Sequence, residues 1–250
     1  MAQPEQPRTL MRISGPDADT FLQNLITQDI GKASGLTYAA LLTPQGKYLA
    51  DFFLLKDDAG FLLDVASAIA PGLAQRLMMY RLRADVAISE ADMTVTCGTG
   101  TPPPGAFADP RTPDMGWRAY GAADSGDSVD WPALRVAQGI PETGIELTQD
   151  SYILEMGFER LNGVDFKKGC YVGQEVTARM KHKTELRKGL AVVALDRSVE
   201  PGTDILADAK PVGTIHTVAG DRALAYVRYG RATGNMTAGD ATVTPVRNIP

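Results

Sequence analysis

The sequence predicts an α+β protein in which mixed α/β lobes precede a small β-barrel. Two observations support this prediction. Helical patterns alternate with short strand-like runs in the first part of the chain, whereas the last part contains only short β-favouring runs separated by Gly, Pro and Asp. We therefore divide the 250 residues into a region 1–187, whose two lobes meet near 98–130, and a barrel, or a sandwich, over 188–250.

The N-terminal lobe is expected to begin with a helix and a β-meander. Apolar residues recur at helical spacing from Phe21 to Ile26, behind an acidic first turn, which predicts a helix over about residues 16–29. The stretch TYAALLTPQGKYLADFFLLKDDAGFLLDVA then contains three apolar runs separated by turn residues, a pattern typical of a meander. Helical spacing returns over residues 68–82.

The rest of the chain is read in the same way. Residues 98–114 are so rich in Gly and Pro that neither a helix nor a central strand is expected there. A helix follows at about 131–138. The tail contains the strand-like runs AVVAL, DILA, PVGTIHTV, ALAYVRY and ATVTPV, which predict the barrel.

Composition excludes several classes of protein. The 25 basic and 30 acidic residues give a net charge of -5, which argues against binding to nucleic acid. The N-terminus lacks the apolar core of a signal peptide, and no apolar run reaches the roughly 20 residues that span a bilayer. Cys97 and Cys170 are far apart and neither has metal-ligand spacing. We therefore expect a cytoplasmic protein with no membrane partner, disulfide or metal site.

The most unusual segment is NGVDFKKGCYVGQEVTAR, which surrounds Cys170. Two lysines precede the thiol, and a helix is expected to begin near Gly173 and to run to about Lys183. Positive charge and a helix N-terminus both stabilise a thiolate. Two other interpretations stay open, because a free Cys is often a small buried hydrophobe and because a thiol hydrolase would need His182 or His216 nearby.

The run KGCYVGQE, followed by Thr177-Ala178-Arg179, resembles the signature of the YgfZ-type folate-binding proteins in the glycine-cleavage T-protein superfamily. The resemblance extends to SGPDADTFLQNLITQDI, LLTPQGKYLADFFL, RVAQGIPETGIEL and the β-rich tail. It implies a T-protein-like fold with mixed α/β lobes around a central cavity and a C-terminal small β-barrel. It also implies tetrahydrofolate as the cofactor and a role with iron-sulfur assembly or client proteins.

The same resemblance implies a set of site residues. The working group would be Cys170, supported by Lys168, Gln174 and Glu175. The cofactor-binding residues would be Trp131, Asp51, Gly169, Tyr171, Gly173 and Arg179. A purely structural interpretation stays open for several of them, since glycines can shape a turn, Gln and Glu can begin a helix, and a tryptophan can anchor a core.

Three departures from the family pattern bear on the mechanism. Arg8 stands where a tryptophan is expected, and Ala137 stands where the T-protein has a pterin-binding glutamate. Asp51 matches one of two adjacent aspartates, but Ala50 replaces the other. These losses argue against conventional aminomethyltransferase activity. The alternative to an assembly factor is a folate-dependent one-carbon enzyme with Asp51 as its carboxylate.

Overall fold

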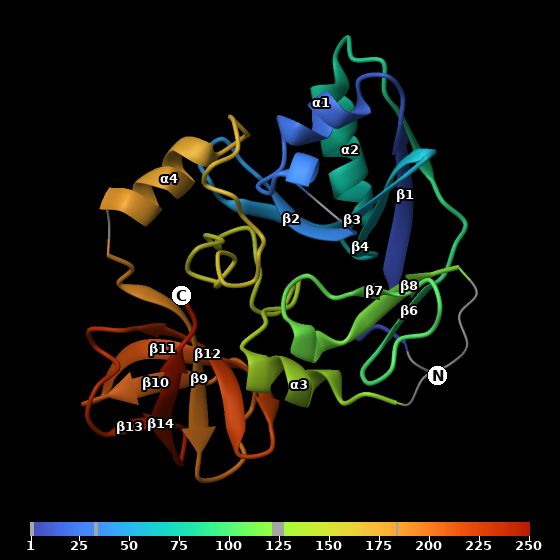
Figure 1. The fold of residues 1–250 in the computed structure, drawn as a ribbon. Coiled ribbons are helices and arrows are strands. Elements are labelled where there is room, and N and C mark those ends of the chain that lie inside the picture. The colour runs from blue at the N-terminus through green and yellow to red at the C-terminus, as the bar shows by residue number, and fades with distance from the viewer. Residues whose placement is uncertain (1–2, 33–34, 122–127, 184) are drawn as a thin grey trace. The chain divides into compact units, whose positions relative to one another are not determined.

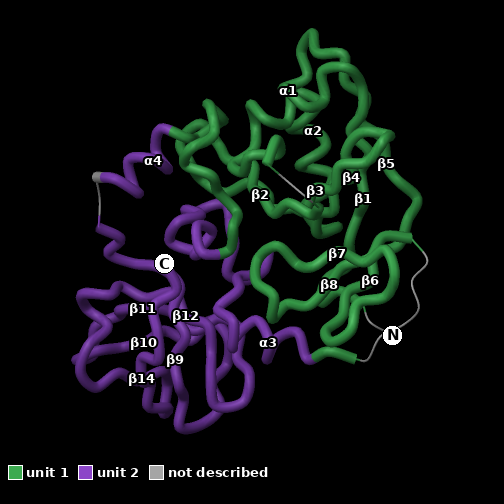
Figure 2. Tube along the Cα trace, viewed as in Figure 1, with its two compact units in different colours: residues 1–129, 161–174 green, residues 130–160, 175–250 purple. Residues whose placement is uncertain are grey.

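The computed structural model describes residues 3–32, 35–121, 128–183 and 185–250 (Figure 1). The chain forms two compact units, Met1–Val129 with Leu161–Gln174 and Asp130–Arg160 with Glu175–Pro250 (Figure 2). Each unit combines two separate segments of the chain, so the division predicted after residue 187 stays a prediction. Among the described helices, none combines the length and the apolar character that crossing a bilayer requires.

The first unit contains most of the helices and strands of the predicted N-terminal lobes. Its elements are β1 (Arg8–Ser14), α1 (Ala18–Gln23), η1 (Ile30–Lys32), β2 (Leu36–Leu42), β3 (Tyr48–Asp57), β4 (Gly60–Ala66), α2 (Ala70–Arg81), β5 (Ala87–Glu90), β6 (Val95–Gly98), β7 (Phe107–Ala108), η2 (Pro113–Met115) and β8 (Trp117–Tyr120). The meander β2-β3-β4 is confirmed, and it belongs to an antiparallel sheet of order β2-β3-β4-β1-β5.

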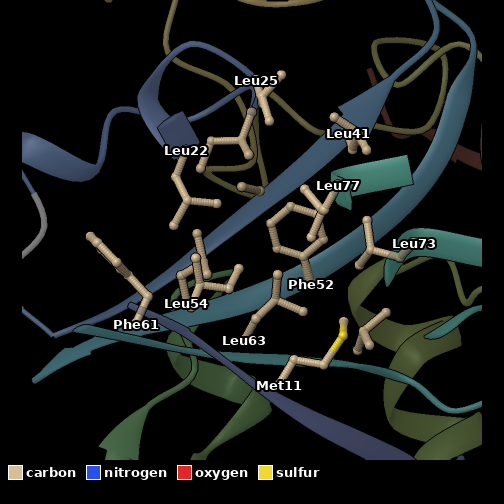
Figure 3. Close-up of a cluster of buried hydrophobic side chains, with 14 of the residues drawn as sticks. Met11, Leu22, Leu25, Leu41, Phe52, Leu54, Phe61, Leu63, Leu73 and Leu77 are labelled. Atoms are coloured by element: carbon tan, nitrogen blue, oxygen red, sulfur yellow. The ribbon is translucent and has the colours of Figure 1, made fainter. Parts of the chain in front are cut away.

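One face of this sheet carries the apolar core of the first unit. Alternate residues of the strands, such as Phe52 and Leu63, point to that face, because successive side chains of a strand point to opposite sides (Figure 3). Leu22 of α1 and both Leu73 and Leu77 of α2 pack against them. The two helices therefore cover the same face of the sheet.

The opposite face of the sheet carries buried charges instead. Asp64 of β4 is completely buried and accepts hydrogen bonds from Arg8 (2.6 Å), Arg118 (2.9 Å) and Tyr120 (3.1 Å). Burial opposes its ionisation, but the two guanidinium groups hold the pKa of Asp64 below its usual range. Because Arg118 and Tyr120 lie on β8, this charge cluster joins the large sheet to the small sheet β6-β8-β7.

The first helix is shorter than the sequence predicts. It ends at Gln23 rather than near residue 29, although apolar spacing continues to Ile26. Beyond the helix end, the Thr27 hydroxyl donates to the carbonyl of Gly163 (2.6 Å) and accepts from the amide of Ala40 (2.8 Å). These long-range contacts fix Thr27 in a non-helical position, so the helix ends before it.

The region rich in Gly and Pro is mostly irregular, as predicted, but two short elements interrupt it. The strand β7 covers two residues and forms the edge of its sheet, and η2 is a single 3-10 turn. An edge strand needs hydrogen bonds on one side only, so a Pro-rich neighbourhood is compatible with it.

The second unit contains the predicted β-barrel, drawn in orange to red in Figure 1. The barrel is closed, with the order β10-β11-β12-β9-β14-β13. The short strand β13 was not predicted. The elements are α3 (Trp131–Gln138), α4 (Gln174–Lys183, whose first residue belongs to the first unit), β9 (Lys188–Leu195), β10 (Asp204–Ala207), β11 (Lys210–Ala219), β12 (Arg222–Arg228), β13 (Met236–Ala238) and β14 (Ala241–Asn248).

Helix α3 has the bounds that the sequence predicts, and a buried ion pair ties it to the barrel. Arg135 is 1% exposed, and its guanidinium lies 3.2 Å from Glu146 and donates to the Thr217 hydroxyl (3.0 Å) on β11. Glu146 in turn accepts from the amide and the hydroxyl of Thr217. Every charge in this cluster has a partner, as burial requires.

Candidate functional site: an anchored loop that presents Cys170

Cys170 is exposed, in a loop that leads directly into α4. The helix begins at Gln174 and ends at Lys183, as predicted. Cys97, by contrast, is buried in β6, and burial raises the pKa of its thiol. Of the two cysteines, only Cys170 can meet a molecule from solution.

Lys168, two residues before the thiol, points into the protein and is 6% exposed. Its ammonium donates to three backbone carbonyls, those of Gln23 (2.7 Å), Ile26 (2.5 Å) and Gln28 (3.1 Å). These carbonyls lie at and just beyond the end of α1, where helical hydrogen bonding leaves acceptors without partners. Burial lowers the pKa of Lys168 to about 8. Lys168 thus joins the loop to the end of the first helix.

The other side of the loop is anchored by residues 171–173. Tyr171 is buried, and the Lys168 ammonium lies 5.2 Å from its ring centroid. Val172 packs against the apolar core of the first unit. Gly173 has a φ of +84°, and a Cβ placed on it would lie 2.6 Å from the carbonyl oxygen of Thr43, in the β2–β3 turn. Gly173 is therefore required both by its conformation and by the close approach of this turn.

The remaining motif residues lie at the surface or at the start of α4. Gly169 is exposed, and a Cβ placed on it would meet open space. The Gln174 side-chain amide donates to the Gly169 carbonyl at 3.3 Å, which closes the loop across Cys170. Glu175 and Arg179 are exposed and form an ion pair of 3.1 Å along the helix. In this arrangement Gln174 shapes the loop, while Glu175 and Arg179 face the solvent.

Asp51 lies on the charged face of the first sheet and is 8% exposed. One carboxylate oxygen accepts from the Tyr38 hydroxyl (3.0 Å) and the other from the Tyr48 hydroxyl (2.6 Å). Burial, followed by the nearby charge of Asp51, raises the pKa of Tyr38 well above its usual value, so this phenol stays a neutral donor. The Arg111 guanidinium stands over the Tyr38 ring at 5.6 Å.

Three further residues singled out in the sequence belong to the second unit. Trp131 is the half-buried first residue of α3, behind Asp130, whose carboxylate accepts from the amide of Ala133 at 3.0 Å. His182 is exposed on α4, and His216 lies on β11, where burial lowers the pKa of its imidazole. Cys170 belongs to the first unit.

Asp165 positions the loop and was missed by sequence reasoning. Its carboxylate accepts from the backbone amides of Lys167 (2.6 Å) and Lys168 (3.2 Å) and binds Lys32 (2.7 Å). The signal was present, because an aspartate that precedes a turn commonly accepts from amides two or three residues later. The three carbonyls that bind Lys168 carry no comparable signal, since every residue has a carbonyl.

Clusters of metal-binding side chains are absent from the described residues. Over the described ranges, no group of three or more His, Cys, Asp or Glu side chains has a geometry that could bind a metal ion.

Comparison with known proteins agrees with this fold. Residues 187–248 match the model of the CAF17 C-terminal beta-barrel domain. The structure of the glycine cleavage system aminomethyltransferase T from Bartonella henselae superposes with a TM-score of 0.73, covering 97% of this chain and 83% of that one, at 12% identity. At that identity the likeness shows the fold alone, and it confirms the T-protein-like architecture.

Sequence relatives are more informative about function. The human protein named iron-sulfur cluster assembly factor IBA57, mitochondrial, is 32% identical, with 88% of this chain and 75% of that protein covered. The homologue from Mycosarcoma maydis is 29% identical over 84% of this chain, which spans only 59% of the fungal protein. These relatives are named mitochondrial, so the cytoplasmic location expected from the sequence is wrong.

Replacing Lys168 by Met should destabilise the protein by roughly 1–3 kcal/mol near neutral pH, because three carbonyls lose their donor. The folded-state pKa of about 8 lies below the usual 10.5. The unfolded chain therefore binds more protons between these values, and the stability that Lys168 contributes rises with pH across that range.

Urea unfolding of wild type and Lys168→Met should therefore show a difference in unfolding free energy that widens from about pH 7 to about pH 10, by at most about 3 kcal/mol. The control is Lys167→Met, which alters the exposed neighbour and should leave stability nearly unchanged at both values. A difference that stays constant or narrows as the pH rises would contradict this role of Lys168.

Gly173→Ala should destabilise the loop, because the new Cβ would collide with the Thr43 carbonyl and the positive φ disfavours any L side chain. Gly169→Ala is the matched control, since its Cβ has open space. Thermal unfolding should show a lower midpoint for Gly173→Ala alone. Equal midpoints for the two variants would mean that the turn does not constrain the loop.

Proposed function

Since this chain belongs to the family of IBA57 iron-sulfur cluster assembly factors, we propose that it acts in iron-sulfur cluster assembly and that Cys170 is its working residue. The single observation that carries this proposal is the exposed thiol on a loop anchored at both ends. Free cysteines are usually buried. An exposed thiol on a loop that is held at both ends therefore favours a functional role for the thiol.

The chemistry of the thiol limits what it can do. Iron-sulfur clusters usually take about four protein ligands. Cys170 would supply one thiolate to a cluster, or to a sulfur species, that a partner protein holds with the others. The partner is therefore a cluster-carrying assembly or client protein, and the complex depends on access to Cys170 from solution.

Lys168 and Gly173 act here as positioning residues. The Lys168 ammonium donates its hydrogen bonds to three backbone carbonyls, and Gly173 allows the loop to pack closely against the β2–β3 turn. Between them, Gly169 and Cys170 face outward. Fixing the backbone on both sides reduces the entropy that the loop would lose when a partner binds, which favours association.

The finer part of the proposal is that the protein binds tetrahydrofolate. The resemblance of KGCYVGQE to the YgfZ-type signature supports it. Of the residues that the resemblance assigns to the cofactor, Asp51, Gly169, Tyr171 and Gly173 belong to the first unit, and Trp131 and Arg179 belong to the second. Both oxygens of the Asp51 carboxylate already accept hydrogen bonds from tyrosine hydroxyls, which favours a binding role over a role in proton transfer. We therefore favour an assembly factor that binds folate over a one-carbon enzyme.

Cys170→Ala should abolish the maturation of iron-sulfur client enzymes in cells whose own factor is deleted, because the cluster contact is lost. Cys97→Ala is the matched control, since it removes the other thiol from a buried position. Client enzyme activity at equal levels of the two variants is the measurement. Full maturation by Cys170→Ala would refute the proposed role of this thiol.

Folate binding should quench tryptophan fluorescence on titration with tetrahydrofolate, since an aromatic ligand stacks readily on an indole. The chain has only two tryptophans, Trp117 and Trp131, and Trp117 is buried. Saturable quenching should therefore disappear in Trp131→Phe and persist in Cys170→Ala. Absence of saturable quenching in the wild type would remove folate from the account but leave the assembly role standing.

A further inference from the structure

The second unit contains an open cleft of about 760 Å³ at one end of its barrel. Lys188 begins β9 and Arg187 directly precedes it, while Arg228 ends β12 and Arg231 lies in the turn that follows. The volume lies within the range of small-molecule sites in proteins. The cleft lies wholly within the second unit, whereas Cys170 belongs to the first.

Four basic residues line this cleft in a chain whose net charge is -5. Lys188 and Arg228 stand directly opposite one another in the β9–β12 pairing, and like charges at such positions destabilise a sheet. In the part of the chain that the structure describes, the guanidinium groups of Arg187, Arg228 and Arg231 have no carboxylate within ion-pair distance. Stability of the barrel does not account for this concentration of charge.

Two glutamates, Glu155 and Glu185, line the cleft, and among the described residues neither lies within ion-pair distance of the three arginines. Glu155 is 5% exposed and accepts a hydrogen bond from the Tyr226 hydroxyl. Lys188 lies 3.9 Å from the same carboxylate and 5.3 Å from the centre of the Tyr226 ring. The Glu155 carboxylate thus interacts with Tyr226 and Lys188. The guanidinium groups of the three arginines are left available to a ligand.

The arrangement selects for a particular ligand chemistry. A guanidinium binds carboxylate and phosphate groups through two parallel N–H donors. Three of them around one cleft match a ligand with several negative groups. The Tyr229 hydroxyl donates to the Leu190 carbonyl, and burial raises the pKa of this phenol above its usual value, so it adds no competing negative charge.

We propose that this cleft binds a small anion carrying two or more carboxylate or phosphate groups, held by Arg187, Arg228 and Arg231. The site is independent of the proposed role of Cys170 and of the candidate folate contacts. Binding depends on charge, so its affinity falls as the salt concentration rises.

Isothermal titration calorimetry on the full chain tests the site with two probes, inorganic tripolyphosphate and the peptide tri-L-glutamate. At about 20 mM salt at least one probe should bind with one-to-one stoichiometry, and the affinity should fall at about 200 mM salt. Arg228→Gln and Arg231→Gln should each weaken binding about tenfold, because each removes a charge-assisted contact.

The matched control is Arg222→Gln, which alters an exposed arginine at the other end of β12 and should not change the affinity. Circular dichroism of the variants confirms that the barrel is folded. Binding of tripolyphosphate alone supports the site and assigns a phosphate ligand, and binding of the peptide alone supports it and assigns a carboxylate ligand. Failure of both probes to bind wild type, or an equal loss in Arg222→Gln, overturns the proposal.

Discussion

The buried Lys168 ammonium is the interaction on which the geometry of the Cys170 loop depends. Removing an ammonium from water is costly unless other groups replace the water. The last residue of α1 and two residues just beyond the helix supply three carbonyls, which accept hydrogen bonds from the ammonium in place of water. The contact joins residues that are more than a hundred positions apart in the sequence. The position of the thiol therefore depends on the folding of the first unit and not on the loop alone.

The first unit uses the two faces of its large sheet for different purposes. Helices α1 and α2 cover an apolar face, and Val172 of the motif extends that core toward the loop. The other face holds Asp64 with Arg8 and Arg118, next to the tyrosines that bind Asp51. Arg8, which stands in place of the tryptophan expected from the family pattern, therefore has a structural partner that the tryptophan would not need.

Much of the fold could be predicted from the sequence because its signals are local. Helix α3 has a strong start signal in Asp130 and Pro132, and the meander and the barrel show alternation with turn residues between strands. The first helix was predicted too long because Thr27 is held by residues distant in sequence, a constraint that periodicity does not contain. The strand β13 was missed because three residues cannot establish alternation.

The candidate site was predicted unevenly for a similar reason. The motif drew attention to Cys170, and a residue-level argument alone would have favoured a buried thiol. The direction of Lys168 could not be predicted, because its partners are backbone carbonyls that no residue type marks. The buried pairs of Asp64 and Arg135 were missed because a single charged residue in an apolar run does not identify its partner.

Selective alkylation of the folded protein tests the central claim most directly. Iodoacetamide should modify Cys170 in the native state and leave Cys97 untouched until the protein unfolds, which mass spectrometry can establish. The alkylated protein should keep its fold by circular dichroism and lose its capacity to promote cluster transfer between purified assembly and client proteins. Undiminished transfer after complete alkylation of Cys170 would contradict the account.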